Sequence, residues 1–182
     1  PFAQGIGLRA GYNYAGTKLS SDILSNIDQF NNRSKPISGF FVGVNYEIPL
    51  SIVFFIEPGL NFSSKGYLSD YSDDPIDPLY YKSKTTLYYL DVPVLFKAKM
   101  KVGKANLFAG FGPYFSYGLF ANYNVDGTSD LRNFTESGRQ RFDCGLSFSA
   151  GAEFGNFEIG ASYQLGLVNI DLVDIMKRRN RV

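Results

Sequence analysis

Charged side chains placed at every second position are the part of this sequence whose types and spacing could do chemistry. Apolar residues occupy the alternate positions, so the charges would share one face of a sheet. Gathered in one interior, they could pass a proton or an ion, or they could pair and fill the space. We expect paired, structural charges, because side chains usually fill a barrel of about eight strands. The candidate set is Glu57, Asp91, Lys97, Arg139, Arg141 and Glu153.

The chain lacks side chains on which many kinds of enzyme depend. The chain has no histidine, which removes Ser/His and Cys/His couples and histidine-bound metals. The single cysteine, Cys144, cannot form an internal disulfide. With 18 Lys and Arg against 17 Asp and Glu, the charge is too balanced for binding many phosphates. We therefore expect no enzymatic activity, no cofactor, no bound metal and no nucleic-acid partner.

One polar segment offers other candidates. Residues 70–77 carry enough aspartates to bind calcium weakly, but they lack the spacing and the glycine of a calcium-binding loop. A solvated acidic loop is the expectation. Tyr67, Tyr71, Tyr80 and Tyr81 could stack against a sugar or a protein partner. They could equally belong to an aromatic belt.

Two-residue alternation of apolar and polar side chains runs through seven segments. In the first, Ile6 and Leu8 alternate with Gly7 and Arg9, a period typical of strands with two different faces. No run approaches the roughly 18 apolar residues of a membrane-spanning helix. The predicted strands cover residues 5–14, 39–48, 52–63, 89–100, 107–116, 141–154 and 157–167.

The connections between these segments alternate between short and long. Short ones lie around residues 49–51, 102–104 and 155–156, and long polar ones cover residues 16–36, 65–83 and 122–138. Short and long connections therefore lie at opposite ends of the strands. Bacterial outer-membrane barrels have this asymmetry, with short periplasmic turns, long extracellular loops and strands of about 9–11 residues.

The two ends of the chain add further expectations. An up-and-down barrel needs an even number of strands, so residues 179–182 look like the start of an eighth strand that is truncated. Residues 171–177 have the apolar spacing of a short helix. The chain opens without the segments of a signal peptide, which fits a mature or trimmed chain. No linker divides residues 1–182, which we expect to form a single domain.

Alternation alone fits two architectures: a membrane barrel with its apolar face outward, or a soluble lipocalin-like barrel that encloses a lipophilic ligand. The polar face decides between them. It carries repeated glycines, which a narrow lumen needs beside long side chains, together with charges of both signs that can pair. The membrane barrel is therefore favoured. Aromatic residues near the strand ends resemble interfacial girdles, as at Tyr12, Tyr14, Tyr46, Phe62, Phe115, Tyr117, Phe154 and Phe157.

Four segments carry a resemblance to a known family. Residues 5–13, 90–97, 110–114 and 163–167 make most of the chain similar to the PorT-like outer-membrane β-barrel family of Bacteroidetes. The resemblance implies an outer-membrane location in a Gram-negative cell. Some members of that family are associated with protein secretion and gliding. The chain departs from the family by lacking an aromatic-terminated final strand.

The sequence therefore predicts an all-β fold, an up-and-down antiparallel barrel of about eight strands spanning the outer membrane. The leading functional hypothesis is a monomeric, non-enzymatic cell-envelope protein. Surrounded by outer-membrane lipid, it would present extracellular loops to a protein or glycan partner, in an envelope or secretion assembly. A soluble lipocalin-like carrier is the alternative. A small pore is disfavoured by the narrow lumen.

Overall fold

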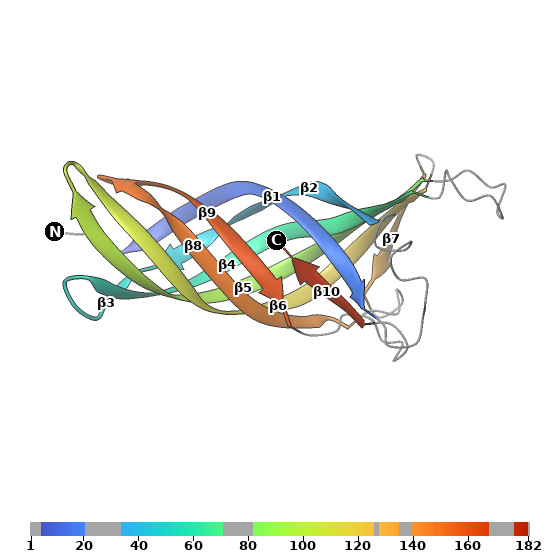
Figure 1. Ribbon diagram of the computed structural model, residues 1–182. Coiled ribbons are helices and arrows are strands. Elements are labelled where there is room, and N and C mark those ends of the chain that lie inside the picture. The colour runs from blue at the N-terminus through green and yellow to red at the C-terminus, as the bar shows by residue number, and fades with distance from the viewer. Residues whose placement is uncertain are drawn as a thin grey trace.

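In the computed structural model of the protein, the alternating segments form strands that curl into an antiparallel barrel (Figure 1). The structure describes residues 5–20, 34–70, 82–125, 128–134, 140–167 and 177–181. No helix within these ranges is long and apolar enough to cross a membrane.

Eight strands form the ring, and two short strands extend it. The ring follows the order β2-β1-β10-β9-β8-β6-β5-β4 and returns to β2, which pairs with β4. β3 pairs with β4 at the short-turn end, and β7 pairs with β6 at the long-loop end. The strands are β1 Ile6–Ser20, β2 Ser34–Tyr46, β3 Ile48–Pro49, β4 Phe54–Asp70, β5 Lys82–Val102, β6 Ala105–Val125, β7 Thr128–Asn133, β8 Phe142–Phe154, β9 Phe157–Gly166 and β10 Lys177–Arg181.

The predicted eighth strand is present as β10. It pairs with β1 from Gly16↔Arg181 to Ser20↔Lys177 and meets β9 at Arg181↔Leu165. The helix expected over residues 171–177 is wrong at its last position, because Lys177 already belongs to β10. The remainder of that segment lies outside the described residues.

The two faces of the strands have the predicted orientation. Apolar side chains point outward, and Leu8 and Phe157 are 87% and 81% exposed. Polar and charged side chains point into the lumen, where Glu57 and Lys97 are each 1% exposed. This arrangement does not favour the lipocalin-like alternative, which requires the apolar face to enclose a ligand.

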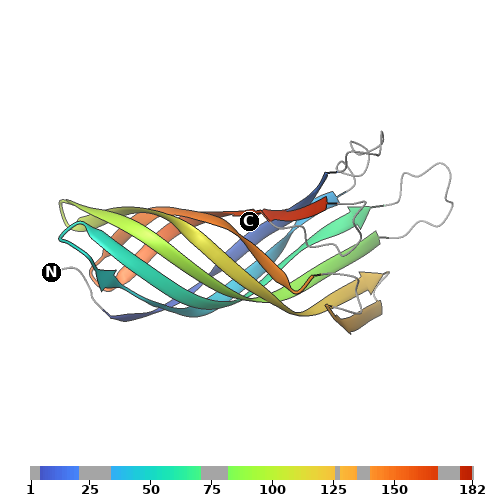
Figure 2. The same ribbon diagram turned by 90° about the horizontal axis from the view of Figure 1, so that it is seen from below.

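Several strands are longer than expected, because residues assigned to the long connections continue the pairing. β5 and β6 each have 21 residues. The connection predicted over residues 122–138 contains β7, which folds back on β6 from Val125↔Thr128 to Phe120↔Asn133. Polar side chains gave these segments the composition of loops, yet hydrogen bonding to a neighbouring strand extends the sheet. Figure 2 shows β7, in gold, at the long-loop end of the barrel.

Glycines on the inner face make room for large rings on neighbouring strands. A Cβ added to Gly118 would lie 2.5 Å from the Phe134 ring, and one added to Gly145 would lie 2.8 Å from the Tyr114 ring. Both distances are too short for real contacts, so the narrow lumen depends on these glycines.

Candidate functional site: the barrel lumen

A network of ion pairs fills the lumen beside the short turns. Its centre is Lys97 on β5, whose Nζ donates to Glu57 Oε2 at 2.9 Å, Glu47 Oε1 at 3.3 Å and Glu158 Oε2 at 2.8 Å. Alternation places Lys99 on the same face, where its Nζ donates to Glu47 Oε2 at 2.5 Å. We call this network the turn-end cluster; it comprises Arg9, Glu47, Glu57, Lys97, Lys99, Glu153 and Glu158.

The remaining members complete the pairing. Lys99 also pairs with Glu153, and Arg9 Nη1 lies 3.5 Å from Glu57 Oε1. Aromatic rings cover the two ammonium groups: the Lys97 Nζ lies 4.1 Å from the centroid of Phe108, and the Lys99 Nζ lies 4.7 Å from that of Phe55. Desolvated ammonium groups gain from such contacts. The cluster therefore combines charge neutralisation with close packing.

Three of these carboxylates, from Glu47, Glu153 and Glu158, have oxygen atoms within 4.8 Å of one another. That spacing alone would suit a metal ion. However, Lys97 and Lys99 already donate to all three carboxylates. The ammonium groups occupy the role that a metal cation would take, so the residues present do not fit a metal centre.

A second group of charges lies farther along the lumen. Asp91 on β5 accepts hydrogen bonds from Ser63 Oγ at 2.6 Å, Lys65 Nζ at 3.1 Å and Ser116 Oγ at 2.5 Å. Lys65 Nζ also lies 5.2 Å from the ring centroids of both Tyr89 and Tyr114. We call Ser63, Lys65, Asp91 and Ser116 the mid-lumen cluster.

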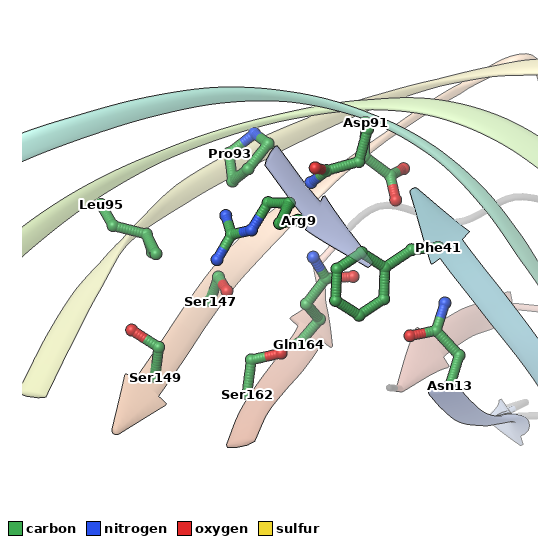
Figure 3. Close-up of a pocket in the computed structure, with 11 residues that line it drawn as sticks. Arg9, Asn13, Phe41, Asp91, Pro93, Leu95, Ser147, Ser149, Ser162 and Gln164 are labelled. Carbon is green, nitrogen blue, oxygen red and sulfur yellow. The ribbon is translucent and has the colours of Figure 1, made fainter. Parts of the chain in front are cut away.

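A small polar cavity of about 50 Å³ lies beside the two clusters (Figure 3). Arg9 points into it from β1, close to Ser147 on β8 in this view. Among the described residues, Asn61 Oδ1 and Ser149 Oγ have no hydrogen-bond partner. A polar cavity of this size with orphaned acceptors is suited to a few water molecules and not to an organic ligand. Its lining is Arg9, Asn13, Phe41, Asn61, Asp91, Pro93, Leu95, Ser147, Ser149, Ser162 and Gln164.

A cluster of buried apolar side chains, which we call the apolar plug, lies in the lumen toward the long loops. It consists of Leu87, Tyr89, Ala121 and Phe134, all fully buried. Phe134 directly follows β7, and its ring meets Tyr89 edge-on with centroids 5.2 Å apart. Folding β7 back on β6 thus delivers this ring to the end of the lumen.

The structure separates the six charges predicted as one network. Glu57, Lys97 and Glu153 belong to the turn-end cluster, whereas Asp91 belongs to the mid-lumen cluster. Six strand residues separate Asp91 from Lys97, which corresponds to about 20 Å. Asp91 therefore lies too far along the strand to share one network with Lys97.

Of the two arginines in the predicted set, the structure describes Arg141. Arg141 precedes β8 at the long-loop end, is half-buried, and lies 5.9 Å from the Tyr117 ring centroid. Twelve residues separate it from Glu153, which is about 40 Å along a strand. Arg139 lies outside the described residues.

Sequence reasoning missed Lys65, which is 1% exposed and pairs with Asp91. It was assigned to a long connection, although it continues the alternation of Asn61 and Ser63 on the inner face. That continued period was the available signal. Tyr67, proposed to stack against a partner, is instead buried on β4, and Tyr71, Tyr80 and Tyr81 lie outside the described residues.

The match to a family model agrees with this architecture. No curated protein matches the chain. Among solved structures, Ail, the attachment invasion locus protein of Yersinia pestis, is similar over 98% of this chain and 95% of its own, with 15% identity and a TM-score of 0.38. The family model described as outer membrane protein beta-barrel domain matches residues 2–172. The chain therefore belongs to this family of β-barrel proteins of the bacterial outer membrane.

Proposed function

We propose that the protein is a non-enzymatic scaffold that holds its long-loop end outside the membrane for contact with a protein or glycan partner. The observation that carries the proposal is a lumen filled at both ends, by the turn-end cluster and by the apolar plug. A filled lumen leaves the exposed strand extensions as the surface available for function. The PorT-like resemblance extends the proposal to an envelope or secretion assembly in Bacteroidetes.

The strand extensions rise beyond a row of stacked aromatic rings. Outward rings on β2, β4, β5 and β6 follow one another, with centroid distances of 6.1 Å for Phe40–Phe62, 5.8 Å for Phe62–Tyr88 and 4.6 Å for Tyr88–Phe120. Aromatic girdles of this kind mark the membrane interface. Beyond Phe62, β4 continues for eight more residues to Asp70, which is about 26 Å of strand before tilt. The parts of β4, β5 and β6 beyond these rings, together with β7, thus project from the bilayer, and we call them the raised sheet.

β7 is the part of the raised sheet best placed for a partner. All six of its residues are exposed. Leu131 is 65% exposed, and Arg132 Nη2 pairs with Asp130 Oδ2 at 2.6 Å. An exposed apolar side chain beside a charged pair suits a polar, reversible interface.

Photo-crosslinking in intact cells tests the scaffold proposal. A photoreactive amino acid at Leu131 should give discrete protein or glycan adducts, whereas the same amino acid at the lipid-facing Leu8 should give lipid adducts only. Equal products at both positions would contradict a partner at β7. The secretion part is tested separately, since a deletion strain with unchanged secretion of cargo proteins would remove it.

Planar-bilayer recordings test the competing small-pore hypothesis. The wild-type protein should give no single-channel events, because the turn-end cluster and the plug occupy the lumen. Regular events from the purified wild-type protein would favour the pore and overturn the scaffold proposal.

A further inference from the structure

The outward face of the raised sheet continues the lipid-facing surface of the barrel beyond the interfacial rings. Tyr88 on β5 and Phe120 on β6 pair with each other, and their outward rings stack with centroids 4.6 Å apart. Every second residue beyond this pair lies on the same face, because successive side chains of a strand point to opposite sides. The outward face can therefore be followed, strand by strand, away from the membrane.

Two cross-strand rows form this face above the aromatic pair. The first row is Thr86↔Asn122↔Leu131 and the second is Lys84↔Asn124↔Ser129, each running from β5 through β6 to β7. The Asn124 amide donates a hydrogen bond to Ser129 Oγ at 2.9 Å, so both side chains lie on one side of the sheet. We call these six residues the polar outer face.

The polar outer face lies at the height of the lipid headgroups. Thr86 is two residues beyond Tyr88 and Lys84 is four residues beyond it, which is about 7 Å and about 14 Å of strand before tilt. Headgroups occupy roughly the first 5–8 Å beyond the hydrocarbon core, and saccharide headgroups extend farther. Because the face points sideways from the barrel, its neighbours are the headgroups of the surrounding outer leaflet.

The side chains of this face suit a saccharide. The amides of Asn122 and Asn124, like the hydroxyls beside them on β5 and β7, both donate and accept hydrogen bonds, as sugar hydroxyls do. Asn122 is half-buried at the centre of the face, and its Oδ1 has no hydrogen-bond partner among the described residues. A rotation of this amide would present Oδ1 to an incoming hydroxyl. Leu131, which is 65% exposed, offers apolar surface to the C–H groups of a sugar ring.

The opposite face of the same strands has a different character. Asp130 and Arg132 form an exposed ion pair on that side, and Leu87 and Ala121 belong to the apolar plug. The polar outer face, by contrast, contains no carboxylate and has one exposed cation, Lys84. Neutral hydrogen-bonding groups with one cation match a saccharide that carries phosphate.

We propose that the polar outer face binds the phosphorylated saccharide headgroup of a glycolipid in the outer leaflet. The amides and hydroxyls contact sugar hydroxyls, and Lys84 contacts a phosphate. The inference rests on the proposed function, because it requires the raised sheet to lie outside the membrane, and it names the glycan partner. Continuity with the lipid-facing surface selects a glycolipid, since its saccharide is already held at this height.

The absence of tryptophan from the chain provides a direct test. Phe120→Trp places a single fluorophore beside the polar outer face, and Tyr46→Trp places one on β2, near the short turns. Both variants are placed in phosphatidylethanolamine nanodiscs and titrated with the core oligosaccharide that mild acid releases from lipopolysaccharide. We expect a saturable fluorescence change for F120W and none for Y46W. A dextran oligosaccharide of similar length should bind at least about tenfold more weakly.

Further substitutions in the F120W background identify the groups that bind. Asn122→Ala with Asn124→Ala should weaken binding about tenfold, because two side chains lose their hydrogen bonds to the saccharide. The matched control is Asp130→Asn with Arg132→Gln on the opposite face, which should change the affinity less than about twofold. Heat-dependent gel mobility verifies that each variant is folded. Lys84→Gln should weaken binding of the phosphorylated oligosaccharide about threefold and leave binding of the dephosphorylated one unchanged.

Three results would overturn the inference: no saturable change in F120W, equal losses in the two double variants, or equal binding of dextran. They are distinguishable from failure of the scaffold proposal. Discrete protein adducts at Leu131 together with a flat F120W titration would leave the scaffold proposal standing and assign this face to a protein.

Discussion

Lys97 Nζ lies 2.9 Å from Glu57 Oε2 inside the lumen, and the two side chains are 1% and 0% exposed. Burying these charges is costly, and the cost is offset only because each charge has several partners. Lys97 contacts three carboxylates, whereas Glu57 is shared between Lys97, Arg9 and the Asn45 amide. Removing Lys97 therefore takes a cation from three carboxylates, whereas removing Glu57 takes only one of three carboxylates from Lys97.

Replacing Lys97 by methionine should destabilise the barrel by about 3–5 kcal/mol, because several buried carboxylates lose their common cation. Glu57→Gln should cost less, about 1–3 kcal/mol, since the amide oxygen still accepts from Lys97. The measurement is urea unfolding of the protein in vesicles. As a control, Arg132→Gln breaks an ion pair in which both side chains are more than half exposed, and it should change stability by under about 1 kcal/mol.

Arg141→Gln should have a smaller effect than Lys97→Met in the same unfolding experiment. Arg141 is half-buried at the long-loop end, where solvent screens its interactions, and it contacts the face of Tyr117. A loss equal to that of Lys97→Met would show that Arg141 belongs to an equally buried network.

The stability of the barrel should depend on which charges of the mid-lumen cluster are removed. Lys65→Met leaves Asp91 buried with only two serine hydroxyls, so we expect a loss of about 3–5 kcal/mol. Adding Asp91→Asn to that variant should recover part of the loss, because the uncompensated charge is gone. Stability that falls further in the double variant would contradict this account.

Gly118 and Phe134 should be coupled. Gly118→Ala inserts a Cβ 2.5 Å from the Phe134 ring, and overpacking of this kind costs about 1–3 kcal/mol. In the Phe134→Leu background the same substitution should cost less, since the smaller side chain leaves room. A double-mutant cycle of unfolding free energies measures the difference, and additive costs would contradict the close contact.

The single Cys144 reports the facing of β8 without any engineering. It is half-buried on the outer face, opposite Phe115 of β6, where lipid should shield it. A hydrophilic maleimide should label Cys144 in denaturant but not in vesicles. Ser129→Cys on the exposed β7, made in a Cys144→Ser background, is the control that should label in both conditions. Rapid labelling of Cys144 in vesicles would contradict the outward facing.

The alternation of apolar and polar residues was sufficient to predict the fold, because the side-chain period of a strand assigns every residue to one face. Ile6, Glu57 and Lys97 were all placed on the correct side for this reason. Strand ends were harder to predict, since hydrogen bonding between neighbours extends β4 and β7 through polar residues with the composition of loops. Lys65 was missed because its strand was ended too early.

Contacts within the lumen could not be predicted from facing alone. Which inward charges meet depends on strand order and stagger, which place Glu47, Lys99 and Glu153 together from three different strand ends. Asp91 shares a strand with Lys97 but lies too far along it. Distances of this kind require the register of the whole sheet.

The connectivity of the turn-end cluster also constrains how the barrel enters the membrane. The β4–β5 hairpin supplies Lys97 with Glu57, but the other two partners of Lys97 lie 50 and 61 residues away, outside that hairpin. Both carboxylate partners of Lys99, Glu47 and Glu153, also lie outside it, so the hairpin carries only part of its counter-charges. A hairpin inserted by itself would expose bare ammonium and carboxylate groups to hydrocarbon. Insertion one hairpin at a time is thus strongly opposed, and the strands must gather around their charges before or while they cross the bilayer.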